Sequence, residues 1–374
     1  MRTYFITTRS TPLLSIPALL LLFLTPQLQA GAILHLASRD NSVQQARLAV
    51  KRLQQLYLPK TALWNTGGWW NAANSLTAIV DYSRVTHSSR YLHVISHTYA
   101  AYAPIQFLKN KYYDDEGWWA LAWIDAYDLT GNQNYLHTAT VIFDDMTTGW
   151  DDTCGGGMWW TKDRKYKNAI ANELFLSLAA HLANRVTDQS QQSKYSAWAI
   201  REWSWFQNSG LIEDDHLIND GLDSHCRNNH RTTWTYNQGV VLGGLTELSR
   251  LPGQAGVLKE AGQIADTAIK KLADSNSVLH EPCEPRCGED GTQFKGIFIR
   301  NLALLQTRTA NPLYARFIAA NADSLLKNAQ SPDHSYGIVW SGPPGVSTAV
   351  SQTSAIDALV ASVMVRGEVQ RTPK

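Results

Sequence analysis

Apolar residues recur with a helical period along almost the whole chain, and strand-like alternation is nearly absent. Breaks rich in glycine, proline and aspartate separate the helical segments. The pattern predicts twelve helices, at residues 43–58, 70–85, 90–108, 116–129, 133–147, 167–185, 190–206, 233–249, 256–273, 292–306, 312–329 and 352–365.

The twelve predicted helices alternate between two kinds. Even-numbered segments begin with polar residues and then become small and apolar on nearly every face, as in 118–123 and 168–173. Odd-numbered segments are one-sided, and in 256–273 an apolar stripe lies opposite lysine and acidic residues. A helix that is apolar all round belongs inside a protein, whereas a one-sided helix belongs on its outside. We therefore predict an all-α fold, an (α/α)6 barrel of six inner and six outer helices.

The first thirty residues differ from the rest, because Arg2 and Arg9 precede an apolar stretch at 13–24 and a small residue, Ala30. This order predicts a signal peptide over residues 1–30. Residues 31–374 are then one catalytic domain, since the whole mature chain is needed to close the barrel. We expect a secreted protein, extracellular or associated with a cell wall, without a stable membrane anchor after signal cleavage. An uncleaved N-terminal anchor is the alternative.

The charge and the aromatic content narrow the possible partners. A net charge of +1 over 374 residues argues against nucleic acid, whose binding proteins concentrate lysine and arginine on one face. Tryptophan occurs 14 times, often in adjacent pairs. Because an aromatic ring offers a stacking surface to a neutral polyol, the composition favours a carbohydrate partner.

Four cysteines in an exported chain are compatible with two disulfides and three connectivities. The short spacing of Cys283 and Cys287 favours a local bond, which leaves Cys154 to pair with Cys226. A zinc site is less favoured than two disulfides, because no Cys-x-x-Cys or His-x-x-x-His spacing accompanies the cysteines. We expect no cofactor and no resident metal.

Four pairs of adjacent aspartates are candidates for acid/base chemistry, and each has a structural alternative as a helix cap or a solvated surface group. Asp114 and Asp115, the aspartate pair, are the ones at the start of a predicted inner helix, surrounded by tyrosine and tryptophan. Two carboxylates at about 5 Å and an effective dielectric of ~20 repel by ~3 kcal/mol, which splits their pKa values by roughly two units. Such a pair supplies the protonated and the ionised carboxyl that glycoside hydrolysis needs. The remaining pairs are Asp144-Asp145, Asp151-Asp152 and Asp214-Asp215.

Other residues near the predicted helix starts are candidates for sugar binding, although each is also explained by core packing, capping or ion pairing. They are Trp70, Asn71, Asn74, Trp118, Asp151, Asn168, Tyr236, Asn237 and Lys295. The loop between Gly210 and Arg231 is rich in aspartate and asparagine, which leaves calcium binding open beside simple solvation. His225 and His230 in that loop are polar loop residues or, less favoured, metal ligands.

Several motifs together resemble the glycoside hydrolase family 76 α-1,6-mannanases, and the likeness extends over essentially the whole mature chain. The motifs are GWWNAAN at 68–74, DDEGWWALA at 114–122, GGGMWW at 155–160, KYKNAIANEL at 165–174 and QFKG at 293–296. The resemblance implies an (α/α)6 barrel and endo-acting hydrolysis of an α-1,6-mannan backbone with retention. It also implies that Asp114 is the nucleophile and Asp115 the acid/base.

Three other functions are compatible with the sequence. One is a transglycosidase that acts on mannose-containing anchors, since this chemistry uses the same glycosyl-enzyme intermediate. Another is a mannan-binding protein without catalysis. The last is a barrel that cuts uronic-acid polysaccharides, which the near-neutral charge and the scarcity of arginine at the inner-helix starts disfavour.

Overall fold

A computed structural model describes residues 26–103 and 108–368 of the chain. Residues 1–25 of the predicted signal peptide lie outside the described residues, so the signal peptide stays a prediction. None of the described helices is long and apolar enough to cross a membrane.

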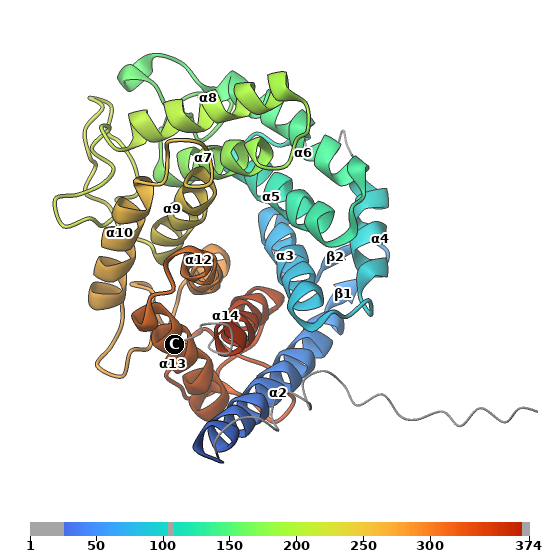
Figure 1. Ribbon diagram of the computed structural model, residues 1–374. Helices are drawn as coiled ribbons and strands as arrows, with labels where there is room; N and C mark the ends of the chain where they lie inside the picture. Colours follow the sequence, from blue (N-terminus) through green and yellow to red (C-terminus); the bar gives the residue numbers. More distant parts are fainter. Residues whose placement is uncertain (1–25, 104–107, 369–374) are drawn as a thin grey trace, which may run out of the picture.

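Six inner helices stand side by side around a common axis, which Figure 1 shows nearly end-on. Each packs against the next, and the last returns to the first, so the ring is closed. The predicted (α/α)6 barrel is therefore confirmed. The inner helices are α3 (Trp69–Thr86), α5 (Tyr113–Thr130), α7 (Ala169–Ala183), α9 (Thr235–Leu248), α12 (Phe294–Thr309) and α14 (Ala349–Glu368).

Outer helices cover the ring and alternate with the inner ones along the chain (Figure 1). They are α2 (Pro26–Gln54), α4 (Leu92–Tyr102), α6 (Gln133–Met146), α8 (Gln189–Phe206), α10 (Val257–Leu272) and α13 (Pro312–Ser324). Short elements lie in the connections: β1 (Tyr57–Leu58), β2 (Leu63–Trp64), η2 (Thr147–Gly149), η3 (Thr153–Gly155), α11 (Gly288–Gly291) and η4 (Leu325–Ala329).

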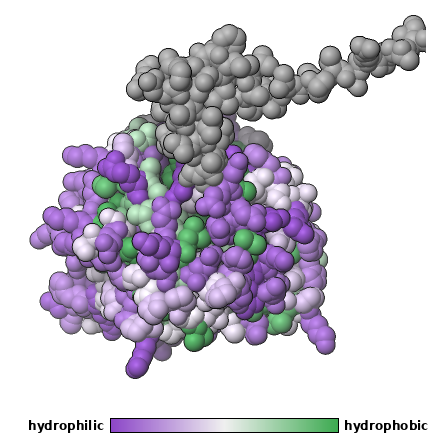
Figure 2. Space-filling view, turned by 90° about the horizontal axis from the view of Figure 1, so that it is seen from below, coloured by the Kyte–Doolittle hydropathy of each residue, from purple (hydrophilic) through white to green (hydrophobic). Residues whose placement is uncertain are grey.

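The burial of the helices follows the two kinds of sequence pattern. Every residue of α7 is buried, whereas α10 buries only the stripe made of Ala261, Ile264, Ala265 and Ala268. The opposite faces of the outer helices carry polar side chains, and the face of the molecule seen in Figure 2 is largely hydrophilic with small hydrophobic patches. The core is thus the layer between inner and outer helices.

The first predicted helix needs a correction at both ends. It was expected over 43–58, but α2 begins at Pro26 and ends at Gln54. The chain then turns into a two-stranded antiparallel hairpin in which Tyr57 pairs with Trp64. The aromatic rings of this pair pack 5.0 Å apart, so local ring packing overrides the helical period there.

The four cysteines form the two disulfides that their spacing favoured. Cys283 bonds to Cys287 within one loop, and Cys154 bonds to Cys226 across 72 residues. The second bond ties together two loops at the end of the barrel where the inner helices begin.

Candidate active site

The N-terminal ends of the inner helices surround a pocket of about 250 Å³, which we call the mouth pocket. Side chains from the first turns of α3, α5, α9 and α12 form its walls, together with the residue before α7 and several loop residues. Its lining is Trp70, Asp114, Trp118, Trp160, Tyr166, Asn168, Asp220, Arg231, Tyr236, Asp290 and Phe294.

The aspartate pair lies in the first turn of α5, where it was predicted. Asp114 lines the mouth pocket, and its Oδ2 accepts a hydrogen bond of 3.0 Å from Nε1 of Trp160. Its other oxygen, Oδ1, is buried and has no hydrogen-bond partner among the described residues. Asp115 accepts a hydrogen bond from Nδ2 of Asn110.

Both carboxyl groups of the pair hold protons more firmly than ordinary aspartates do. Burial raises the pKa of Asp114 well above its usual value, and the neighbouring Asp115 raises it further. Burial also raises the pKa of Asp115 to about 6, against the hydrogen bond from Asn110 and with help from Asp290. The pair therefore keeps one proton near neutral pH, the state in which one carboxyl group is an acid and the other a base.

The loop that carries Trp160 is fixed to the start of α5. The backbone N–H of Tyr113 donates to the carbonyl oxygen of Trp160 at 2.9 Å. Nζ of Lys162 lies 2.8 Å from a carboxylate oxygen of the fully buried Glu116 and 2.8 Å from one of Asp145. Burial raises the pKa of Glu116 to about 9 despite this contact. The contacts of Lys162 with Glu116 and Asp145 thus fix the loop from which Trp160 bonds to Asp114.

Six aromatic rings line the mouth pocket. Tyr236 stacks on Phe294 with ring centroids 3.8 Å apart, and Trp70 stacks on Trp118 at 5.6 Å. Nε1 of Trp70 donates a 2.8 Å hydrogen bond to Asp290. Flat apolar faces beside carboxylates are the surfaces that bind a pyranose ring and its hydroxyl groups.

The glycine-rich loop before Trp159 wraps around a buried lysine. Nζ of Lys167 donates to the carbonyl oxygens of Gly156 and Gly157 at 2.7 and 2.8 Å and contacts Asp151 at 3.0 Å. Gly157 has a φ of +88°, and a Cβ there would lie 2.4 Å from the ring of Trp205, so only glycine fits. Burial opposes ionisation of Asp151, but hydrogen bonds from Trp159 and Lys167 lower its pKa well below the usual range.

The structure brings some of the predicted sugar-binding residues to the mouth pocket and places others elsewhere. Trp70, Trp118, Asn168 and Tyr236 line it. Asp151 instead belongs to the Lys167 cluster behind the loop.

Four further predicted residues are buried between helices, outside the lining of the mouth pocket. Nδ2 of Asn71 donates to Gln293 at 2.7 Å, and Oδ1 of Asn74 accepts from Arg300 at 2.5 Å. Lys295 pairs with Glu284. Asn237 is fully buried, and its side-chain atoms have no hydrogen-bond partner among the described residues.

Sequence reasoning missed three charged residues of the mouth pocket, namely Asp220, Arg231 and Asp290. Asp220 accepts hydrogen bonds from the hydroxyl of Tyr166 and from Nε1 of Trp234, the latter at 3.1 Å. Asp220 and Arg231 lie in loops and Asp290 lies in the single-turn helix α11, so no helical period marks these side chains as facing inward. The available signal was Trp234 shortly before an inner helix, a position that resembles Trp70.

The fold is an (α/α)6 barrel with an acidic, aromatic pocket at one mouth, the architecture of a class that includes glycoside hydrolases. The chain belongs to glycosyl hydrolase family 76, because the sequence model of that family matches residues 46–372.

Several curated relatives are named as mannan endo-1,6-alpha-mannosidases. The mannan endo-1,6-alpha-mannosidase DFG5 of Candida albicans is 26% identical over 79% of this chain and 72% of its own length. DCW1 of the same organism, also named a mannan endo-1,6-alpha-mannosidase, is 27% identical over 63% of this chain. The match spans 58% of DCW1, and in several relatives it spans less than two thirds of their length.

Solved structures share the fold. The Lin0763 protein of Listeria innocua superimposes with a TM-score of 0.77 at 27% identity, over 89% of this chain and 99% of that one. The α-1,6-mannanase GH76A of Salegentibacter sp. HEL1_6 has been solved with α-1,6-mannotriose as an inactive variant in which two consecutive aspartates are replaced by asparagine. It superimposes with a TM-score of 0.76 at 22% identity, over 87% of this chain and 99% of that one.

Proposed function

We propose that this protein is a secreted, endo-acting α-1,6-mannanase that cleaves the mannan backbone with retention through a glycosyl-aspartate intermediate. The observation that carries the proposal is the aspartate pair, Asp114 and Asp115, at an aromatic pocket without a cation bonded to either carboxyl group among the described residues. The two disulfides fit an oxidising compartment, which supports secretion.

In the proposed reaction, one aspartate of the pair donates its proton to the glycosidic oxygen as the bond to the leaving sugar breaks. The other attacks the anomeric carbon and forms a covalent ester with the mannosyl residue. The first carboxylate then removes a proton from water, which attacks the same carbon and releases the nucleophile. Two inversions give net retention.

The assignment of the two roles rests on the family resemblance, with Asp114 as nucleophile and Asp115 as acid/base. Burial raises the pKa of both carboxyl groups, so the direction of the shifts does not choose between the two orders. A bound sugar displaces water and changes both environments, so the roles need a chemical test.

A neutral sugar suits the mouth pocket better than a uronic acid. Three carboxyl groups, those of Asp114, Asp220 and Asp290, line it beside a single guanidinium. A carboxylated sugar would meet like charge there, whereas the hydroxyl groups of mannose donate hydrogen bonds to carboxylates. The named activity of the family 76 relatives supports mannan as the neutral polymer.

The experiment is product analysis by proton NMR on linear α-1,6-mannan. We expect new α-configured reducing ends first, with internal bonds cut, and no cleavage by Asp114→Asn or Asp115→Asn. Products transferred to an added acceptor, in place of free reducing ends, would identify a transglycosidase. Tight mannan binding without any product would instead identify a binding protein.

Azide rescue then assigns the two roles. In the nucleophile variant, azide attacks the substrate directly and gives the inverted β-azide. In the acid/base variant, azide attacks the glycosyl-enzyme and gives the α-azide. We expect the β-azide from Asp114→Ala and the α-azide from Asp115→Ala, and the reverse result would exchange the roles.

A further inference from the structure

A second pocket, of about 450 Å³, adjoins the mouth pocket, and we call it the loop pocket. It lies between the loop segments 153–167 and 222–231. Tyr166 and Arg231 belong to the lining of both pockets, so the two lie next to each other and share these walls. A chain bound at the aspartate pair therefore has room to extend over these loops.

The two pockets differ in charge. Three carboxyl groups and one guanidinium line the mouth pocket. The loop pocket has three cationic side chains, Lys165, Lys167 and Arg231, and a single carboxylate, Asp223. The sign of the charge thus reverses between the two neighbouring pockets, with Arg231 at their border.

Two of the charges in the loop pocket are already engaged. Lys167 is buried and bonded to Asp151 and to the carbonyl oxygens of the glycine-rich loop. Asp223 pairs with Arg227 at 3.1 Å and accepts hydrogen bonds from backbone N–H groups. Neither is therefore available to a ligand, which leaves Lys165 and Arg231.

The remaining two cations are accessible. The guanidinium of Arg231 lies over the ring of Tyr166, with 5.6 Å to the centroid, and forms no ion pair with any described carboxylate. Lys165 contacts Asp163 at 3.3 Å, but 79% of its side chain is exposed. Exposed ion pairs of that kind contribute little and exchange readily for a stronger partner.

The loop pocket is held in shape before any ligand arrives. The disulfide between Cys154 and Cys226 joins its two loop segments, and both cysteines line it. Nδ2 of Asn229 donates a 2.8 Å hydrogen bond to the hydroxyl of Tyr166, and Oδ1 of Asn229 accepts one from the backbone N–H of Arg231 at 3.0 Å. Such preorganisation lowers the entropy cost of binding.

We propose that the loop pocket binds a phosphate ester carried by the mannan chain that occupies the mouth pocket, with Arg231 and Lys165 as its ligands. A guanidinium offers parallel N–H donors that match two phosphate oxygens, and a phosphate monoester carries nearly two charges at neutral pH. The inference rests on the proposed function, which it deepens by naming a substituted substrate. It predicts that phosphorylated α-1,6-mannan is preferred over the neutral polymer.

The test measures binding, so that it does not depend on turnover. The variant with both Asp114→Asn and Asp115→Asn is titrated by calorimetry with α-1,6-mannotriose and with the two trisaccharides phosphorylated at either terminal mannose. We expect at least one phosphorylated isomer to bind roughly tenfold more tightly than the neutral sugar, as charge-assisted hydrogen bonds allow. Adding Arg231→Gln should reduce this ratio to near one, and Lys165→Gln should reduce it partly.

Arg227→Gln is the matched control, because Arg227 is exposed, lies in the same loop and is already paired with Asp223. It should leave the tenfold ratio unchanged. Equal affinity for all three trisaccharides, or an equal loss of the ratio in Arg227→Gln and Arg231→Gln, overturns the proposal while leaving hydrolysis of neutral mannan intact. Binding of a phosphorylated isomer alone, dependent on Arg231, keeps the loop pocket and refutes the neutral substrate. If no trisaccharide binds, both proposals fail.

Discussion

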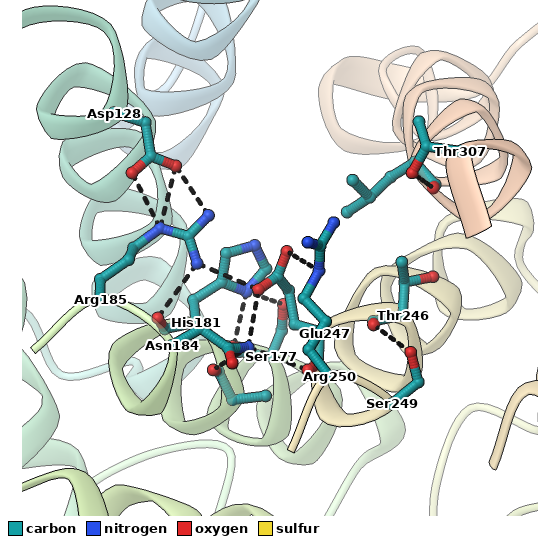
Figure 3. A network of polar contacts seen from close by, with 12 residues as sticks. Asp128, Ser177, His181, Asn184, Arg185, Thr246, Glu247, Ser249, Arg250 and Thr307 are labelled. Atoms are coloured by element: carbon teal, nitrogen blue, oxygen red, sulfur yellow. Dashed lines mark hydrogen bonds and ion pairs between the residues drawn. The ribbon is translucent and has the colours of Figure 1, made fainter. Parts of the chain in front are cut away.

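The aspartate pair at the mouth and the Arg185 cluster at the far end hold their carboxyl groups in opposite ways. At the mouth, Asp114 and Asp115 accept hydrogen bonds from neutral groups, and burial raises both pKa values. At the far end, where the inner helices finish, Arg185 binds Asp128 through three hydrogen bonds and Glu247 through a fourth (Figure 3).

In the Arg185 cluster the carboxyl groups are therefore compensated by cations. Burial opposes ionisation of Glu247, but His181 and Arg185 together hold its pKa below the usual range. Asp128 lies in α5, His181 in α7, Glu247 in α9 and Arg185 in the turn just after α7, so the cluster ties three inner helices together (Figure 3). The difference teaches that the charges of the Arg185 cluster serve cohesion, whereas no described cation is bonded to the aspartate pair, as suits a catalytic pair.

The largest effect expected from this comparison is on turnover at the mouth. Asp115→Asn should lower kcat/KM on linear α-1,6-mannan by ~10²–10⁴-fold, the usual contribution of a positioned acid or base, without loss of stability. Asp128→Asn should do the reverse, keeping kcat/KM and lowering the free energy of unfolding, because it weakens a bidentate ion pair. Kinetics and urea unfolding of both variants check this. Loss of turnover in a fully folded Asp128→Asn protein contradicts the division.

Removing the cation from the far end should cost the most stability. Arg185→Met leaves Asp128 and Glu247 without their shared partner, and the side chain of Glu247 is only 3% exposed. We expect a loss of about 3 kcal/mol in the free energy of unfolding, at the lower end of the range for broken buried pairs, because water reaches Asp128. Turnover per folded molecule should stay unchanged. Urea unfolding measures the loss, and a change below about 1 kcal/mol would show that the cluster is not cohesive.

The aspartate pair at the mouth should also determine how the activity depends on pH. Below about pH 6 both aspartates of the pair are protonated and no nucleophile is present, whereas above it one of them has lost its proton. We expect kcat/KM to rise with pH up to an apparent pKa near 6, with a slope of up to tenfold per pH unit below it. This value belongs to the coupled pair and not to one residue. A profile from pH 4 to 9 that is flat or falling between pH 5 and 7 would contradict the assignment.

The helices of this fold could be predicted from the sequence better than the positions of its loops. The barrel was predictable because burial on all sides leaves a visible pattern, as α7 shows. The aspartate pair was predictable because its place in the first turn of an inner helix decides which way it faces. Asn71 and Asn74 begin an inner helix too. Asn71 points about 100° away from Trp70 and bonds to Gln293, whereas Asn74 lies on the same face as Trp70 but one turn further along the helix, where it bonds to Arg300.

Residues that tertiary contacts bring to the mouth pocket have no recognisable pattern in the local sequence. Asp220 is positioned by the bridge between Asn168 and Gly221, and Asp290 by the short helix α11, whose Gly288–Gly291 span carries no apolar period. Arg231 depends on the disulfide-linked loops. Their positions follow from how distant segments meet, which periodicity does not encode.

The smallest expected effect is the stability lost when an exposed ion pair is removed in place of a buried one. Arg250 also contacts Glu247, at 3.3 Å, but 42% of its side chain is exposed, so water screens the pair and replaces its hydrogen bonds. We expect Arg250→Met to lower the free energy of unfolding by about 0.5 kcal/mol. Arg185→Met and Arg250→Met remove a cation from the same carboxylate, but Arg185→Met also removes the partner of Asp128. The loss measured for Asp128→Asn is therefore subtracted before urea unfolding compares the buried with the exposed partner of Glu247. If Arg250→Met costs as much as Arg185→Met, the number of ion pairs, and not their burial, distinguishes the far end from the mouth.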